Sequence, residues 1–219
     1  MKFINNQNGI ALVTALMLTL ISLVIILTLL YLVNQGITTV GSQKRYHNAL
    51  EASHGGVDVF SREIIPGIIT VINNDPADPA TAVTNSLVTL KTRFSSIGLD
   101  FTQTGDCLRQ KLTLPASQWT ACTANNRTTD PRNEADAMFV LKGVGSFSSG
   151  YKVYSKIVDT TPGNSDASGI DYLDSGAGVT GSSAGISPKH LPALFRMEVQ
   201  GEKEQNPKER ALLSVLYAY

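Results

Sequence analysis

The chain has 219 residues, of which 42% are hydrophobic and 16% are charged, and its formal net charge is zero. This length suits one ordinary domain plus a membrane segment, and the balanced charge does not favour a polyanionic partner such as a nucleic acid. The charged fraction is below the roughly one quarter typical of soluble domains, and no charged residue occurs between Lys2 and Lys44.

The first predicted element is a membrane-spanning helix that follows a short polar leader. The leader reads MKFINNQNG, and after Gly9 residues 10–33 contain no charged residue, proline or glycine. As a helix this run would be about 36 Å long, enough to cross a hydrocarbon core of about 30 Å. Its few polar members all carry hydroxyl groups, which can bond to the helix's own carbonyl groups. They are Thr14, Thr19, Ser22 and Thr28.

This N-terminal segment has three interpretations. A cleaved secretory signal would have a shorter apolar region and an A-x-A-like cleavage site beyond it, and the sequence NQGITTVG after Val33 lacks that pattern. An uncleaved membrane anchor fits the apolar run equally well. The third interpretation is a leader that is removed at Gly9.

The third interpretation rests on a resemblance to type IV prepilins, which have a short basic leader, a glycine and then an unbroken apolar helix. More narrowly, GIALVTALMLTLISLVI, QKRY and ALEASHGGV resemble the PilX N-terminal family of pilus assembly proteins, over roughly residues 1–65. The resemblance implies that a prepilin peptidase removes residues 1–9 by cleaving after Gly9, and that the new amino terminus at Ile10 is methylated. A glycine suits such a site because the peptidase must approach the backbone closely. The resemblance also implies that the N-terminal helix packs against those of other pilins and minor pilins.

Two residues depart from the pattern of major pilins. Ile10 stands where their mature chain begins with Phe, and Thr14 stands at the fifth mature position, where they carry a glutamate. In the family that carboxylate pairs with the amino terminus of a neighbouring subunit, and a carboxylate in a bilayer is normally kept only for a function. Because Thr14 cannot form this pair, we expect a minor pilin or a tip-forming type II secretion pseudopilin.

The location of the chain follows from its flanking charge. Lys2 should keep the leader in the cytoplasm, so the chain would cross the bacterial inner membrane once, with its C-terminal domain in the periplasm. After assembly it would lie in the pilus fibre or at its tip. In the oxidising periplasm, Cys107 and Cys122 are predicted to form a disulfide. By restricting the unfolded chain, it would stabilise the folded state by about 3 kcal/mol. Two free thiols are the alternative, and a zinc site is disfavoured because no histidine is near.

Residues 34–66 are predicted to continue the helix in amphipathic form. One face carries Tyr46, Leu50, Ser53, Val57, Phe60 and Ile64. Charged residues lie mostly on the other face, as in a helix laid against an apolar surface. Gly55 and Gly56 indicate either the close approach of another backbone or a local kink, and Pro66 and Gly67 are expected to end the helix.

The remaining residues, 67–219, are predicted to form an α+β head domain. Residues 72–81 suggest a turn-rich linker, and residues 82–97 a second helix with Thr84 or Asn85 as its cap. Residues 100–136 are expected to be a polar loop that carries the disulfide. Four stretches rich in Val, Leu, Tyr and Phe then predict strands. They are 138–144, 150–160, 193–202 and 210–219, the last two forming a C-terminal hairpin.

A Gly-, Ser- and Asp-rich segment over residues 159–189 is predicted to be a flexible loop. Within it, residues 164–175 loosely resemble a calcium loop, but Asn164 replaces the usual first Asp and Ser175 stands where a bidentate Glu is needed, so a solvated acidic loop is favoured. His47, His54 and His190 are best interpreted as surface or packed histidines, and the first two lie too far apart along one helix to share a metal.

The whole chain is therefore expected to be a pilin-like α+β protein, with a long N-terminal helix packed on a C-terminal antiparallel sheet. No catalytic motif of the common hydrolase, metalloprotease or P-loop types is present, so we expect neither an enzyme nor a cofactor. The leading hypothesis is a minor pilin that primes, joins or caps a fibre. The alternatives are an adhesive or aggregation subunit that acts through its exposed loops, a type II secretion pseudopilin, and an uncleaved membrane-anchored periplasmic domain.

Overall fold

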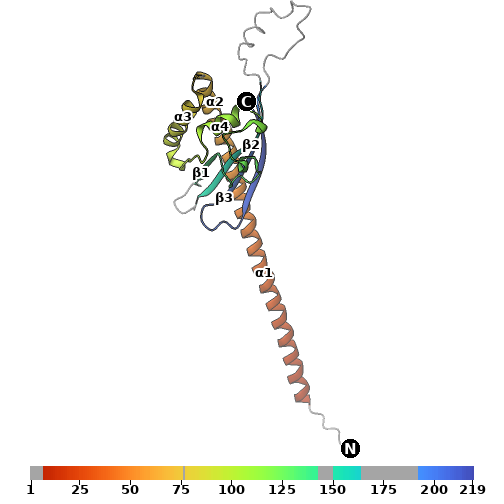
Figure 1. The fold of residues 1–219 in the computed structure, drawn as a ribbon. Coiled ribbons are helices and arrows are strands. Elements are labelled where there is room, and N and C mark those ends of the chain that lie inside the picture. The colour runs from red at the N-terminus through yellow and green to blue at the C-terminus, as the bar shows by residue number, and fades with distance from the viewer. Residues whose placement is uncertain (1–6, 76, 143–149, 164–191) are drawn as a thin grey trace, which may run out of the picture. The chain divides into compact units, whose positions relative to one another are not determined.

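The computed structural model describes residues 7–75, 77–142, 150–163 and 192–219. It separates into two compact units, residues 1–45 and Tyr46–Tyr219. The first unit consists of the N-terminal part of α1 (Gln7–Val59), and the second contains the rest of α1, three further helices and a four-stranded sheet (Figure 1). The apolar N-terminal helix and the α+β layout are thus as predicted.

The sequence predicted that the helix would end at Pro66 and Gly67, but the helical conformation continues past both residues. A π-helical turn (Phe60–Ile64) follows α1, with the N–H of Ile65 donating to the carbonyl of Phe60, and α2 (Ile65–Asn74) continues directly from it. The proline therefore lies in the first turn of α2, directly after the π-helical turn, at a position where its fixed φ suits a helix.

The predicted linker and second helix are shifted in the structure. Helix α3 (Pro79–Arg93) begins where Asp78 accepts a hydrogen bond from the N–H of Thr81, so Thr84 and Asn85 lie inside the helix and are not its caps. Asp before Pro is a strong start signal because it supplies the cap and the proline supplies a preset first turn. A short 3₁₀ turn (Ser95–Ile97) then closes this segment.

The polar stretch 100–136 is more ordered than the predicted loop. It contains α4 (Gly105–Thr113), capped by the Thr104 hydroxyl, and two 3₁₀ turns (Ala116–Gln118 and Ala124–Arg127). Helix α4 buries Leu108 and Leu112 in the core although most of its residues are polar. Two apolar residues four positions apart suffice to orient a short helix on a core.

The four predicted strands are confirmed with small shifts in their bounds. They are β1 (Ala137–Leu141), β2 (Tyr151–Thr161), β3 (Leu194–Lys203) and β4 (Arg210–Ala218), in the order β1-β2-β3-β4 with every neighbouring pair antiparallel. The last two form the expected hairpin. Because β2 extends to Thr161, the first residues of the predicted loop 159–189 are strand, and residues 164–189 lie outside the described residues.

The C-terminal part of α1 packs on the inner face of the sheet. Ser53, Phe60 and Ile64 are buried as predicted, Leu50 and Val57 are half-buried, and Tyr46 is exposed. Gly55 and Gly56 face the side chains of Leu141, Val153 and Val199, so the close approach at these glycines is to side chains of the sheet and not to another backbone. The close backbone approach occurs at Gly201 of β3, opposite Ala49 and Ser53.

The two outer strands of the sheet differ in whether the backbone groups on their outer sides are hydrogen-bonded. On the outer side of β1, Met138 exchanges both of its backbone hydrogen bonds with Asp100. On the other side, Ala193 and Tyr219 exchange both of their backbone hydrogen bonds, so by alternation the peptide groups of Leu212, Ser214 and Leu216 face away from β3. Within the described residues no strand pairs with this edge of β4.

Candidate functional site

The apolar run at the start of α1 is the most distinctive surface of the first unit. Its large apolar side chains between Ile10 and Val33 are all more than half exposed, from 52% at Ile26 to 70% at Leu12. The helix is long and apolar enough to cross a membrane. Such a surface is far larger than the apolar patches that soluble monomers normally expose, so it suits an apolar environment such as a membrane.

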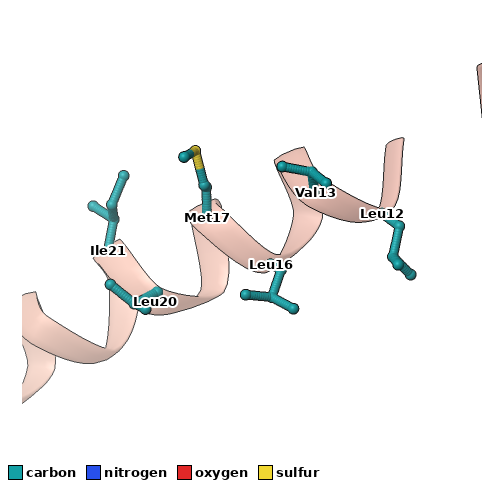
Figure 2. Close-up of a pocket in the computed structure, with 6 residues that line it drawn as sticks. All are labelled: Leu12, Val13, Leu16, Met17, Leu20 and Ile21. Carbon is teal, nitrogen blue, oxygen red and sulfur yellow. The ribbon is translucent and has the colours of Figure 1, made fainter. Parts of the chain in front are cut away.

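A shallow apolar hollow lies along this helix between neighbouring side chains. Figure 2 shows the six side chains that line it, which project from successive turns. They are Leu12, Val13, Leu16, Met17, Leu20 and Ile21. None carries a hydrogen-bonding group, so this surface can hold acyl chains or another apolar helix by van der Waals contact, whereas a polar ligand would find no partner.

The threonine hydroxyl groups of this segment are satisfied within the helix, as predicted. Thr14 donates to the carbonyl of Ala11 at 3.0 Å, and Thr28 donates to the carbonyl of Val24 at 2.7 Å. Thr19 does the same with Leu16 at 2.9 Å. These bonds remove the cost of placing hydroxyl groups in hydrocarbon. Because residue 14 is a threonine, this position carries no charge.

The predicted processing site lies in the first turn of α1. The helix begins at Gln7, so Gly9 and Ile10 are both helical, and the side chain of Ile10 is 68% exposed. Most of the predicted leader, residues 1–6, lies outside the described residues. The structure therefore gives the position of the predicted cleavage bond, whereas cleavage itself stays a prediction.

The structure joins the two cysteines of the second unit in a disulfide. Cys107 lies on α4, and Cys122 lies between the 3₁₀ turns Ala116–Gln118 and Ala124–Arg127. Their Cα atoms are 4.9 Å apart. The side chain of Gln110 strengthens the same connection by accepting from the N–H of Ala121 at 2.9 Å. The disulfide thus holds an irregular segment against α4.

The second unit buries charged side chains that were not predicted from the sequence, among them Lys111, Asp136 and Lys156. Lys111 of α4 contacts Asp136 with 2.5 Å between Nζ and Oδ1, and both side chains are fully buried. Lys156 of β2 is also buried, and its Nζ is surrounded by oxygens of the segment 125–133. Lysine is mostly a surface residue, so spacing and composition give no signal for such a site.

The histidines and acidic residues give no metal centre in the described part of the chain. His47 and His54 both lie on α1, and His47 contacts Glu51 at 3.4 Å in an exposed pair. Across residues 7–75, 77–142, 150–163 and 192–219, no three His, Cys, Asp or Glu side chains come close enough to hold a metal ion. His190 and the calcium-like segment 164–175 lie outside these ranges.

Comparison with known proteins gives no relative. No protein-family model matches the chain, and no curated protein or solved structure matches it. The pilin resemblance therefore rests on the N-terminal residues alone.

Proposed function

We propose that this chain is a minor pilin that takes part in the assembly of a type IV pilus. The observation that carries the proposal is the exposure of every large apolar side chain between Ile10 and Val33 on a helix that continues into the core of an α+β unit. A plain membrane anchor also needs the apolar segment, but it does not need an apolar helix whose later turns form part of the core of a folded unit.

The proposed role begins with insertion of residues 10–33 in the inner membrane and cleavage after Gly9. The helix then leaves the lipid and packs among the N-terminal helices of other subunits. Acyl chains and apolar side chains are similar environments, so this transfer costs little for a helix that is apolar all round. The bonded hydroxyls of Thr14, Thr19 and Thr28 suit both environments because they seek no outside partner.

Thr14 supports a place at the end of a fibre. An internal subunit of the kind described above uses a carboxylate at this position to neutralise the amino terminus of its neighbour. The Thr14 hydroxyl already donates to Ala11 and carries no charge, so it cannot do this. A subunit at the tip, or one that starts assembly, has no such neighbour to neutralise.

Mass spectrometry of the full chain isolated from its native membrane tests the proposal. We expect a chain that starts at N-methylated Ile10, and a Gly9→Leu variant that keeps its leader because the added side chain obstructs the peptidase. Gly36→Ala is the matched control: it changes another glycine of α1, where an added Cβ meets nothing within 4 Å, and should be processed normally. An intact leader on the wild-type chain, in cells whose prepilin peptidase is active, would overturn the proposal.

A further inference from the structure

Lys111 and Asp136 form an unusually close pair inside the second unit. The Nζ of Lys111 lies 2.5 Å from Oδ1 of Asp136, and neither side chain has any exposure to solvent. Lys111 belongs to α4, and Asp136 directly precedes β1. The pair therefore joins two elements that are separated along the chain by an irregular segment.

The surroundings of Lys111 differ from those of the other buried lysine. The Nζ of Lys156 has four oxygen neighbours within hydrogen-bond distance. They are the carbonyl oxygens of Asn125 (2.6 Å), Asp130 (3.3 Å) and Asn133 (2.7 Å) and the hydroxyl of Thr128 (3.0 Å). An ammonium group has three donors to satisfy, and this site satisfies all of them.

Lys111 has no comparable set of acceptors. In the part of the chain that the structure describes, its Nζ has one hydrogen-bond acceptor, Oδ1 of Asp136, and the ring of Trp119 at 5.5 Å. Two donors of a charged ammonium would thus lack a hydrogen-bond partner in a site without solvent, which is costly. An amide nitrogen has a single N–H and no charge, so it fits this site better than an ammonium group does.

The carboxyl group of Asp136 is held in place by hydrogen bonds to both of its oxygens. Its Oδ2 accepts a hydrogen bond from the backbone N–H of Ile157 at 2.7 Å, and its own backbone N–H donates to the carbonyl of Ser155 at 2.9 Å. Burial has the largest effect on this carboxyl and raises its pKa, although Lys111 acts in the opposite direction. Burial thus favours the protonated carboxyl, which reacts with a neutral amine.

We propose that Lys111 and Asp136 are joined by an intramolecular amide bond. Proton transfer within the pair gives an amine and a carboxylic acid, and Nζ attacks Cγ of Asp136. Oδ2 carries the negative charge of the tetrahedral intermediate and is stabilised by the N–H of Ile157, as in an oxyanion hole. The Cγ–Oδ1 bond then breaks, and Oδ1 leaves as water with two protons that came from the ammonium group. The C–N bond replaces the C–O bond, and no oxidant or other reactant is needed.

This bond would be a second covalent cross-link in the second unit, in addition to the disulfide. It would link α4 to the start of β1, whereas the disulfide links Cys107 of α4 to Cys122. Reducing agents would open the disulfide and leave the amide intact. The proposal does not depend on a role in pilus assembly, because it concerns only the chemistry of the buried pair.

The intact mass of the full chain, reduced and denatured after purification in detergent, tests the proposal. We expect a mass lower than that of the unlinked chain by one water molecule. Trypsin should then release residues 110–127 joined to residues 133–142, because acylated Lys111 is not cleaved. A chain of full mass that trypsin cuts after Lys111 would overturn the proposal, and so would loss of water without the joined peptides.

Substitutions test whether Lys111 and Asp136 are the two residues that the bond links. Lys111→Met and Asp136→Ala should each restore the full mass and abolish the joined peptides. Lys152→Met is the matched control, because this lysine of β2 lies over the ring of Tyr154 at 5.2 Å and should keep the loss of water. The wild-type result decides the proposal even where a variant fails to fold, since it requires no substitution. Joined peptides in Lys111→Met would also contradict the assignment.

Discussion

Gly201 on β3 lies against Ser53 on α1 so closely that a Cβ built on the glycine would stand 2.6 Å from the Ser53 hydroxyl oxygen. The same Cβ would stand 2.6 Å from the carbonyl oxygen of Ala49. Ser53 is fully buried here and donates to Ala49 at 2.9 Å and to Ala211 of β4 at 3.3 Å. The helix and the hairpin thus meet at a point where only a hydrogen atom fits.

Gly201→Ala should therefore destabilise the second unit. The methyl group must push apart two backbones, and overpacking of this kind costs about 1–3 kcal/mol. Denaturant unfolding of the full chain in detergent, followed by the fluorescence of Trp119, measures the loss. Gly67→Ala is the control: its Cβ would meet Leu90 at an ordinary 3.8 Å, so it should be neutral or stabilising by up to about 1 kcal/mol. Equal stability of the two variants would contradict the steric argument.

The ion pair between Lys91 and Asp100 should make stability depend on pH in the acid range. Lys91 donates to Asp100 with 2.7 Å between Nζ and Oδ1, and this bond is the main reason why the pKa of Asp100 is lowered. A lowered carboxyl pKa stabilises the fold above the unfolded value of about 3.9, and that stabilisation is lost as pH falls through the folded value. Because both side chains are nearly half exposed, solvent screening limits the effect to about 1 kcal/mol or less.

Lys91→Met is the variant that tests this dependence. The wild-type chain should be slightly more stable than the variant at neutral pH, and the two should converge as Asp100 becomes protonated. Urea unfolding at a series of pH values, with the titration of Asp100 followed by NMR, gives both quantities. Parallel stability curves over the whole acid range would show that the pair contributes nothing.

The disulfide between Cys107 and Cys122 should protect both thiols and stabilise the second unit. Iodoacetamide should label neither cysteine in the unfolded, unreduced chain and both after reduction. A Cys107→Ser/Cys122→Ser double variant should lose about 3 kcal/mol in the chain-entropy account of a loop of about fifteen residues. Alkylation of both cysteines without prior reduction would contradict the pairing.

Thr14→Glu should change the place of the chain in a fibre. A carboxylate at this position supplies the charge that Thr14 lacks, so the variant should enter sheared fibres in larger amounts than the wild-type chain. Immunoblots of fibre and membrane fractions measure the ratio. Thr19→Glu puts the same charge about one and a half turns further along and controls for the cost of a carboxylate in lipid, which is about 2.5–3.5 kcal/mol at the helix centre. An equal effect of the two substitutions would contradict a specific role for position 14.

The parts of the fold that were predictable from the sequence have strong local patterns. The apolar run 10–33 contains no interruption, and the strands carry β-branched and aromatic residues bounded by turns, so both follow from composition and periodicity. The disulfide partners followed from the presence of only two cysteines in a chain assigned to an oxidising compartment. In each case the signal lies within a short stretch of sequence.

The errors arose where tertiary packing decides the outcome. The π turn before Pro66 lets a helix pass a residue that usually ends one. Gly201 is an ordinary strand glycine until Ser53, far away in the sequence, packs against it. Lys111, Asp136 and Lys156 read as surface charges because their partners are distant in sequence or are backbone carbonyls, which no side-chain pattern reveals.

The two edges of the sheet differ in whether another strand can form backbone hydrogen bonds with them. Asp100 occupies the outer side of β1 at Met138, whereas the peptide groups of Leu212, Ser214 and Leu216 on β4 face no strand within the described residues. Residues 211–219 also lack the charges and prolines that usually deter edge pairing. Among the described residues, a strand added from another molecule would therefore find unpaired backbone groups along β4, whereas at Met138 of β1 it would meet backbone groups already bonded to Asp100.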